Sequence, residues 1–299
     1  MSSACLLTVT HPEKPMRILL IGAKGMLGTD MLQEWTSDEL IPADTEDADI
    51  RDLNQVQSLV FKTKPHWIVL TAAYTDVDGS EKNPDLAFAV NAKGAENVAR
   101  VSTEFGARLF YVSTDYVFDG TSSRPYEPND RPNPLNTYGA SKAAGESAVQ
   151  KYAKEWCIGR TSWLFGASGA SFPEKILRAS ETRSELTVVA DQVGSPTYTR
   201  DLASVMRDLV RADARGIVHA TNSGTCSWFE FAQEILTQAG RPFIRVLSIT
   251  ASEIARPARR PAYSVLSPLS LNQRGITMRH WKETVPFYLK DLRQVGKLR

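Results

Sequence analysis

Cysteine and histidine are scarce in this chain, and their scarcity narrows the chemistry open to it. Of 299 residues, three are cysteine and four are histidine. The cysteines, Cys5, Cys157 and Cys226, are odd in number and far apart, which argues against a disulfide framework and favours a reducing compartment. No histidine has a neighbour at the spacing of metal ligands. We therefore expect a cytoplasmic protein without a metal site.

Long apolar runs and an excess of one charge are also missing. No window approaches the roughly 20 apolar residues that span a bilayer. The 35 basic and 34 acidic residues give a net charge of +1, so no bulk field draws the chain to nucleic acid or to a membrane. The apolar run at 5–9 has no basic residue before it, so it does not resemble a signal peptide. We expect residues 1–15 to be an N-terminal extension and the partner to be a small molecule.

The apolar residues that are present follow an α/β rhythm. Short apolar runs at 17–21, 40–43, 67–71 and 109–113 predict central strands, and amphipathic stretches at 26–35, 54–62 and 84–105 predict the helices between them. This alternation is typical of a doubly wound parallel sheet of the Rossmann type. We expect that domain to cover residues 16–164.

The rhythm weakens after about Trp163, where a Gly/Ser stretch and several Pro-containing turns occur. We expect residues 165–299 to form a smaller α/β lobe that binds substrate, with the segment near 215–235 as a candidate to return to the Rossmann domain. Residues 216–220 predict a strand. Ser227 followed by Glu230 predicts the capped start of a helix.

A glycine triplet follows the first predicted strand. Gly22, Gly25 and Gly28 allow a tight turn and a close approach of the backbone to a pyrophosphate, which the N-terminus of the next helix attracts. Met26 and Leu27 begin that helix and are expected to lie at the same site. A plain strand-to-helix turn is the alternative, and the position after the first strand favours a dinucleotide site.

Asp44 closes the second predicted strand, where a Rossmann fold places an acid on the adenosine ribose. Three further acids follow by residue 49, so a solvated loop acid is the alternative. An acidic cluster without an adjacent Arg or Lys would repel a 2′-phosphate. The pattern therefore favours NADH and leaves NADPH open.

Two further segments are candidates for the dinucleotide. Asp49 and Ile50 precede the third strand and are expected near the adenine. Ala72, Ala73 and Tyr74 follow that strand at the carboxyl edge of the sheet, where small residues leave room for a cofactor. Simple packing is the alternative for both alanines.

Tyr138 and Lys142 have the YxxxK spacing, which places them one turn apart on one helical face. A nearby ammonium favours the phenolate and lowers the pKa of a tyrosine, so the pair can move a proton to or from a carbonyl oxygen. The spacing alone also arises by chance. Thr114, at the end of a central strand, adds a hydroxyl upstream.

Several segments together carry a family resemblance. They are the glycine loop, 112–118 (VSTDYVF), 134–138 (PLNTY), 160–163 (RTSW), 191–197 (DQVGSPT) and 260–266 (RPAYSVL). With them, nearly the whole chain from Met16 closely resembles the extended short-chain dehydrogenase/reductases, and within them the dTDP-4-dehydrorhamnose reductases.

The resemblance implies roles for the residues at the chemical end. Thr114 would hydrogen-bond the reacting oxygen of the sugar, with Asp115 beside it in the substrate site. Tyr138 would be the proton donor. Lys142 would lower the pKa of Tyr138 and hold the nicotinamide ribose.

The resemblance also places two residues against the substrate. Trp163 would lie against the sugar or its nucleotide, although a Trp after a strand is more often core. Arg256, Arg259 and Arg260 form a basic cluster suited to a pyrophosphate. Arg260 matches the family motif, and a solvated surface charge is the alternative.

The implied reaction is the NAD(P)H-dependent reduction of the C4 ketone of dTDP-4-dehydro-L-rhamnose to dTDP-L-rhamnose, a polysaccharide and O-antigen precursor. A reductase or epimerase of another 4-keto deoxysugar nucleotide is an alternative. Dehydratases carry an Asp-Glu pair after the equivalent Thr, and Tyr116 follows Asp115 here, which counts against dehydration. A non-catalytic regulatory subunit of a methionine adenosyltransferase is the alternative outside the enzymes. A homodimer is also left open; no motif for the family's metal-bridged dimer was found.

Overall fold

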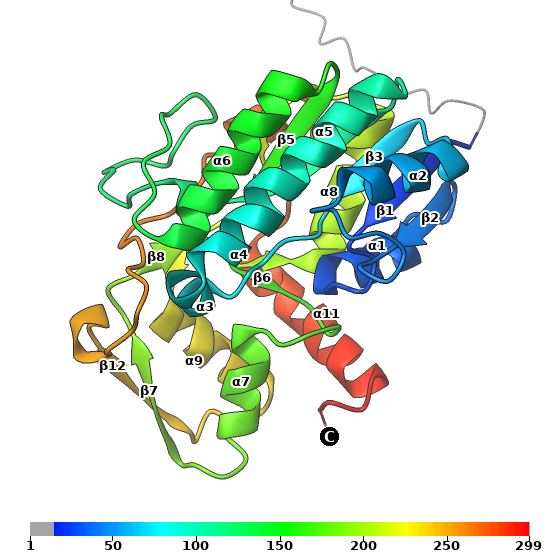
Figure 1. Ribbon diagram of the computed structural model, residues 1–299. Helices are drawn as coiled ribbons and strands as arrows, with labels where there is room; N and C mark the ends of the chain where they lie inside the picture. Colours follow the sequence, from blue (N-terminus) through cyan, green and yellow to red (C-terminus); the bar gives the residue numbers. More distant parts are fainter. Residues whose placement is uncertain (1–14, 299) are drawn as a thin grey trace, which may run out of the picture.

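A six-stranded parallel sheet forms the centre of the computed structural model, which describes residues 15–298 (Figure 1). Its strand order is β10-β5-β4-β3-β1-β2, and the order reverses between β1 and β3. The strands are β1 (Arg17–Ile21), β2 (Glu39–Ala43), β3 (Trp67–Leu70), β4 (Arg108–Thr114), β5 (Trp156–Thr161) and β10 (Gly216–His219). The predicted Rossmann-type α/β fold is confirmed. The expected extension lies, except for Pro15, outside the described residues.

Helices cover both faces of this sheet because its inner strands are apolar on both sides. In β1, Ile18 and Leu20 face one core, and Leu19 and Ile21 face the other, as side chains alternate along a strand. The first core is closed by α1 (Met26–Glu34) and α8 (Thr199–Arg211), the second by α2 (Leu53–Thr63), α5 (Ala95–Glu104) and α6 (Thr137–Tyr152). Figure 1 shows α5 and α6 side by side over the sheet.

The stretch predicted as one helix at 84–105 is divided. It comprises α4 (Pro84–Phe88), the π-helical turn η1 (Ala89–Gly94) and α5. A π-helical turn inside a helix often marks a functional site because it redirects side chains. Here the redirected residue is Asn91, whose contacts are described below.

A smaller group of elements lies at one end of the sheet, in the lower half of Figure 1. Strands β7 (Glu185–Val189) and β12 (Arg245–Ile249) pair in parallel. Helices α7 (Phe172–Ala179) and α9 (Trp228–Gln238) pack against these strands, and α11 (Trp281–Gln294) packs against α9. Helix α9 begins with the predicted capping box of Ser227 and Glu230. Although α8 and β10 follow residue 165, both pack into the central sheet layers.

Short elements join the two parts. Strand β6 (Leu164–Phe165) pairs with β9 (Thr197–Tyr198), and β8 (Val193–Gly194) pairs with β11 (Cys226–Ser227). The remaining elements are α3 (Val77–Lys82), η2 (Asp115–Val117), η3 (Ala251–Glu253) and α10 (Leu269–Asn272). No helix within residues 15–298 is long and apolar enough to cross a membrane.

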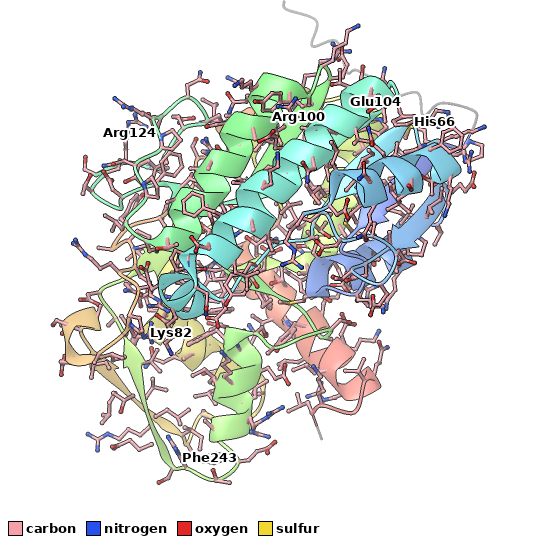
Figure 2. The ribbon with its side chains drawn as sticks, viewed as in Figure 1. His66, Lys82, Arg100, Glu104, Arg124 and Phe243 are labelled. Carbon is pink, nitrogen blue, oxygen red and sulfur yellow. The ribbon has the colours of Figure 1, made fainter. Side chains whose placement is uncertain are left out.

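Charges of both signs are spread over the outer surface. Glu104 and Arg124 lie near the edge of the molecule in Figure 2. Arg100 pairs with Glu96 over 2.8 Å, and Arg124 pairs with Asp130 over 2.8 Å. Such mixed pairing agrees with the balanced composition of the chain.

Candidate active site

The glycine loop makes a tight turn between β1 and α1. Gly22 has φ of 97°, a conformation that favours glycine. A Cβ at Gly28 would lie 2.3 Å from the carbonyl oxygen of Gly22, so only glycine lets the helix start this close to the turn. The backbone is therefore open to a ligand at this point.

Helix α1 begins without a side-chain cap. Gly25 occupies the N-cap position and makes no side-chain hydrogen bond. The first amide groups of a helix otherwise lack partners and carry a partial positive charge. Met26, Leu27 and Gly28, which form the first turn, line a cavity of about 690 Å³. An anionic group such as a pyrophosphate fits this turn.

Asp44 lies on the same cavity at the end of β2. Its carboxylate accepts hydrogen bonds from the backbone amides of Lys24 and Thr45, each over 2.9 Å. This orientation suits a carboxylate that receives a ribose hydroxyl.

The acidic cluster around Asp44 has basic neighbours, contrary to the sequence-based description. The Lys24 ammonium lies 2.7 Å from a Glu46 carboxylate oxygen. Arg51, which lines the cavity, pairs with Asp49 over 2.5 Å. Lys24 lies in the turn after β1, and Glu46 follows β2, 22 residues later in the sequence. Spacing along the sequence therefore could not reveal the contact between them.

Of the remaining residues predicted to bind the cofactor, some line the cavity and one does not. Ile50, Ala72 and Ala73 line the cavity, and Tyr74 does not. A Cβ added to Gly79 would lie 2.6 Å from the Tyr74 hydroxyl, which places that side chain against α3 instead.

Asn91, which the sequence analysis did not single out, holds the loop after β3. Its side chain accepts from the Tyr74 amide over 2.8 Å and donates to the Tyr74 carbonyl over 3.0 Å. It also donates to Ser141 on α6 over 2.9 Å. A polar residue in an otherwise apolar helical stretch was the available signal.

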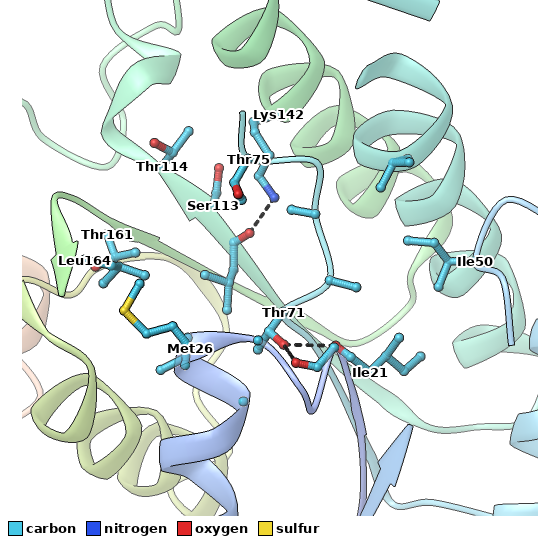
Figure 3. A pocket seen from close by; sticks show the side chains of 18 of the residues that line it. Ile21, Met26, Ile50, Thr71, Thr75, Ser113, Thr114, Lys142, Thr161 and Leu164 are labelled. Atoms are coloured by element: carbon cyan, nitrogen blue, oxygen red, sulfur yellow. Dashed lines mark hydrogen bonds between the residues drawn. The ribbon is translucent and has the colours of Figure 1, made fainter. Parts of the chain in front are cut away.

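The residues expected to carry out the chemistry come from α6 and the end of β4. Asn136 caps α6 by accepting from the Gly139 amide over 2.7 Å, which fixes the turn that carries Tyr138. Thr114, Tyr138 and Lys142 all line the cavity. Figure 3 shows the Lys142 side chain among Ser113, Thr114 and Thr75, with Met26 and Thr71 at the glycine-loop end.

Burial dominates the protonation of this pair. It raises the pKa of the Tyr138 phenol to about 12, with the Thr114 hydroxyl opposing the rise and Asp115 adding to it, so the lowered pKa expected beside Lys142 is not found. Burial also lowers the pKa of the Lys142 ammonium to about 7, against the opposing charge of Glu146. At neutral pH the phenol therefore carries the proton that a donor needs.

Asp115 is a buried acid beside the reacting groups. It is 2% exposed and accepts from the Thr114 hydroxyl over 3.0 Å. Burial raises its pKa to about 7, with the hydroxyls of Ser264 and Thr114 opposing the rise. Asp115 lines the cavity at the position predicted for substrate contact.

Trp163 lines the cavity where the sheet meets the smaller lobe. Its φ is 47°, which is uncommon for a bulky residue and marks a constrained position. The indole stacks on Trp228 with ring centroids 3.5 Å apart. The backbone carbonyl accepts from the Thr197 amide over 3.2 Å, so two of the motif segments meet here.

Arg260 does not line the cavity. Its guanidinium binds both carboxylate oxygens of Asp78 on α3, over 3.0 and 2.7 Å. The structure thus gives Arg260 a partner within the protein. Its predicted contact with the substrate would have to replace or extend that pair.

Comparison with known proteins identifies the family. The family model described as RmlD substrate binding domain matches residues 16–294. The chain belongs to this family. The RmlD family match covers both the central sheet and the smaller lobe, and it confirms the resemblance found from the sequence segments.

Individual relatives agree with the family match. The chain is 40% identical to the spore coat polysaccharide biosynthesis protein SpsK of Bacillus subtilis, covering 92% of this chain and 97% of that protein. It is 36% identical to a dTDP-4-dehydrorhamnose reductase of Burkholderia thailandensis, covering 93% and 99%. A crystal structure of dTDP-4-dehydrorhamnose reductase from Bacillus anthracis in complex with NADP has a TM-score of 0.90 and 40% identity, covering 93% of this chain and 100% of that one.

Proposed function

We propose that this chain is an NAD(P)H-dependent oxidoreductase that reduces the C4 ketone of dTDP-4-dehydro-L-rhamnose to dTDP-L-rhamnose. One observation carries the proposal: Thr114, Tyr138 and Lys142 lie at one end of a cavity whose other end is the glycine loop. The arrangement suits a dinucleotide and a carbonyl substrate bound together.

The cofactor end fits NADH or NADPH. The uncapped first turn of α1 would hold the pyrophosphate, and Asp44 would hold the adenosine ribose. When bound, the dihydronicotinamide supplies the hydride. The net negative charge of the cluster at 44–49 favours NADH, while Lys24 and Arg51 give a 2′-phosphate two nearby cations.

The protein's own part in the reaction is proton transfer and orientation. The Thr114 hydroxyl would hold the ketone oxygen, and the Tyr138 phenol would donate its proton to that oxygen as negative charge develops. Lys142 would support the phenolate that remains and contact the nicotinamide ribose. Asp115 and Trp163 would position the sugar.

The substrate follows from the relatives' names and from the smaller lobe. The Burkholderia thailandensis and Bacillus anthracis proteins are named dTDP-4-dehydrorhamnose reductases, and each is matched over most of its length. We assign the dTDP part of the substrate to the elements after residue 165, with Arg260 at the pyrophosphate. A cytoplasmic location and a homodimer remain predictions from the sequence.

The test is an absorbance assay with purified full-length chain, each cofactor and a panel of 4-keto deoxysugar nucleotides. We expect stoichiometric oxidation of NADH or NADPH with dTDP-4-dehydrorhamnose. Conversion of the sugar without net cofactor oxidation would favour an epimerase. Failure with every ketosugar, together with co-purification of a methionine adenosyltransferase, would favour the regulatory subunit.

A further inference from the structure

A buried carboxylate lies one helical turn beyond Lys142. Glu146 is on α6, four residues after Lys142, and is 1% exposed. It does not line the cavity. Burying a carboxylate is costly unless its oxygens are fully bonded, so its partners decide what it does.

Those partners lie on two central strands. Arg160 on β5 donates from Nε and Nη2 to the two oxygens of Glu146, over 2.9 and 2.7 Å. Ser113 on β4 donates its hydroxyl to Glu146 over 2.6 Å. Arg160 is 1% and Ser113 3% exposed. The carboxylate thus ties α6 to β4 and β5 deep in the protein.

This tie acts next to the reacting groups. Ser113 lies between Val112 and Thr114 on β4. The carbonyl of Val112 accepts a hydrogen bond from the Lys142 ammonium over 2.7 Å. Fixing Ser113 to α6 therefore fixes the strand positions that contact Lys142 and the predicted substrate oxygen. Stability alone does not explain the pair, because apolar replacements of buried ion pairs are often neutral or stabilising.

We propose that Glu146 is a positioning residue of the active site. Together with Arg160 and Ser113, it sets α6 against β4 beside Lys142, and its negative charge favours the ammonium form of that side chain. The kinetic part of the test rests on the proposed reductase function, whereas the titration of Lys142 does not.

The other groups around Lys142 leave Glu146 as the anion that acts on it. Tyr138 precedes Lys142 by one turn, and the Tyr111 ring lies 4.1 Å from the Lys142 nitrogen. Burial raises the pKa of both phenols, so both are neutral near pH 7. Beyond Glu146 lies Arg160, whose Nη1 is 3.4 Å from Nε2 of His219. Burial lowers the pKa of His219 to about 3, which leaves that ring neutral.

Asp115 is the remaining acid near the reacting groups. It follows Thr114 in η2 and hydrogen-bonds the Thr114 hydroxyl rather than Lys142. The pKa of Lys142 is governed by burial and by Glu146. A change at Glu146 should therefore be visible in the titration of Lys142.

The experiment compares Glu146→Gln with the double variant Glu146→Gln/Arg160→Gln in the full chain. Carbon-13 NMR of lysine labelled at Cε follows the ionisation of Lys142, assigned with Lys142→Met. We expect the Lys142 midpoint to move to lower pH by about one unit in Glu146→Gln, because an anion's field is lost. The double variant also loses the Arg160 cation, which lies beyond Glu146, so its midpoint should move in the same direction by a smaller amount. The pH profile of kcat/KM for NADH should move in the same direction.

Two controls separate positioning from stability. Glu146→Asp keeps the charge and should leave the Lys142 midpoint close to wild type. Glu96→Gln/Arg100→Gln removes an ion pair from the outer side of α5 and should leave both the midpoint and the profile unchanged.

The outcomes are decisive in either direction. The single variant leaves a buried Arg160 charge unpaired and can unfold, in which case the double variant gives the answer. A folded double variant with the wild-type Lys142 midpoint would overturn the proposal. Failure of both variants to fold would also overturn it, by making Glu146 a structural residue. If the Lys142 midpoint moves to lower pH in the variants but the wild-type chain reduces no ketosugar, the proposed function is overturned and this inference stands.

Discussion

The ammonium of Lys142 donates a hydrogen bond to the backbone carbonyl of Val112 over 2.7 Å. This contact links α6, which carries Tyr138, to β4, which carries Thr114. The proton donor and the hydroxyl predicted to hold the substrate oxygen therefore belong to one rigid unit. The rigidity matters because small displacements of reacting groups cost large factors in rate.

Replacing Tyr138 with Phe should remove the proton donor and little else. We expect kcat to fall by about 10²- to 10⁴-fold, the usual contribution of general acid catalysis. The Kd for NADH, measured by calorimetry, should stay within about twofold, since one phenolic hydrogen bond contributes modestly to binding. A Tyr138→Phe protein with full turnover would contradict the assignment of the donor.

Replacing Gly28 with Ala should damage the cofactor end. The new Cβ would meet the Gly22 carbonyl at 2.3 Å, which forces the turn apart. We expect the Kd for NADH to rise by about tenfold or more, equivalent to about 1.4 kcal/mol. Gly240→Ala is the control, because it strains a left-handed backbone position without meeting any atom within 4 Å. It should lower the melting temperature and leave the Kd unchanged.

Two substitutions should move the choice of cofactor in opposite directions. Asp44→Asn removes a charge that repels a 2′-phosphate and should raise the NADPH/NADH ratio of kcat/KM by about tenfold. Lys24→Ala removes a cation near Glu46 and should lower the ratio. Steady-state kinetics with both cofactors measures each change. A ratio that stays constant in both variants would mean that these residues do not face the ribose.

His219 should make the fold sensitive to acid. Burial holds its pKa at about 3, below the ordinary value near 6.5, with the Arg160 charge adding to the decrease. As pH falls below 6.5, the unfolded chain binds a proton that the folded chain does not, so stability is lost until about pH 3. At pH 5 this loss is about 2 kcal/mol.

Urea unfolding of wild type and His219→Gln at pH 7 and pH 5 measures that loss. The variant should lose less free energy of unfolding between the two pH values than wild type does. An equal loss in both proteins would show that His219 is protonated alike in the folded and unfolded states.

Much of the central sheet could be predicted because its strands are buried on both faces and therefore read as continuous apolar runs. The π-helical turn at 89–94 could not, since the same residues fit a regular helix. The place of α8 was not anticipated, whereas β10 lies within the segment near 215–235 that was a candidate to return to the Rossmann domain. The apolar face of α8 is compatible with either lobe, and only tertiary packing selects the central sheet.

The candidate site was also predictable from the sequence only in part. Residues near β-strand ends, such as Gly22 and Thr114, could be placed because the carboxyl ends of parallel strands meet at one edge. Arg260 was expected to meet a ligand, and it pairs with Asp78, 182 residues away. No local pattern specifies a contact of that separation. Glu146 and Arg160 are only 14 residues apart, but their pair joins α6 to β5, and neither helical nor strand periodicity specifies it.

The most direct test of the account follows the hydride itself. The full-length chain is incubated with dTDP-4-dehydrorhamnose and NADH or NADPH carrying deuterium at the transferable C4 position. The product is then analysed by mass spectrometry and NMR. The account predicts dTDP-L-rhamnose with one deuterium at C4 of the sugar and one oxidised cofactor per product. A product without deuterium, or no product with either cofactor, would contradict it.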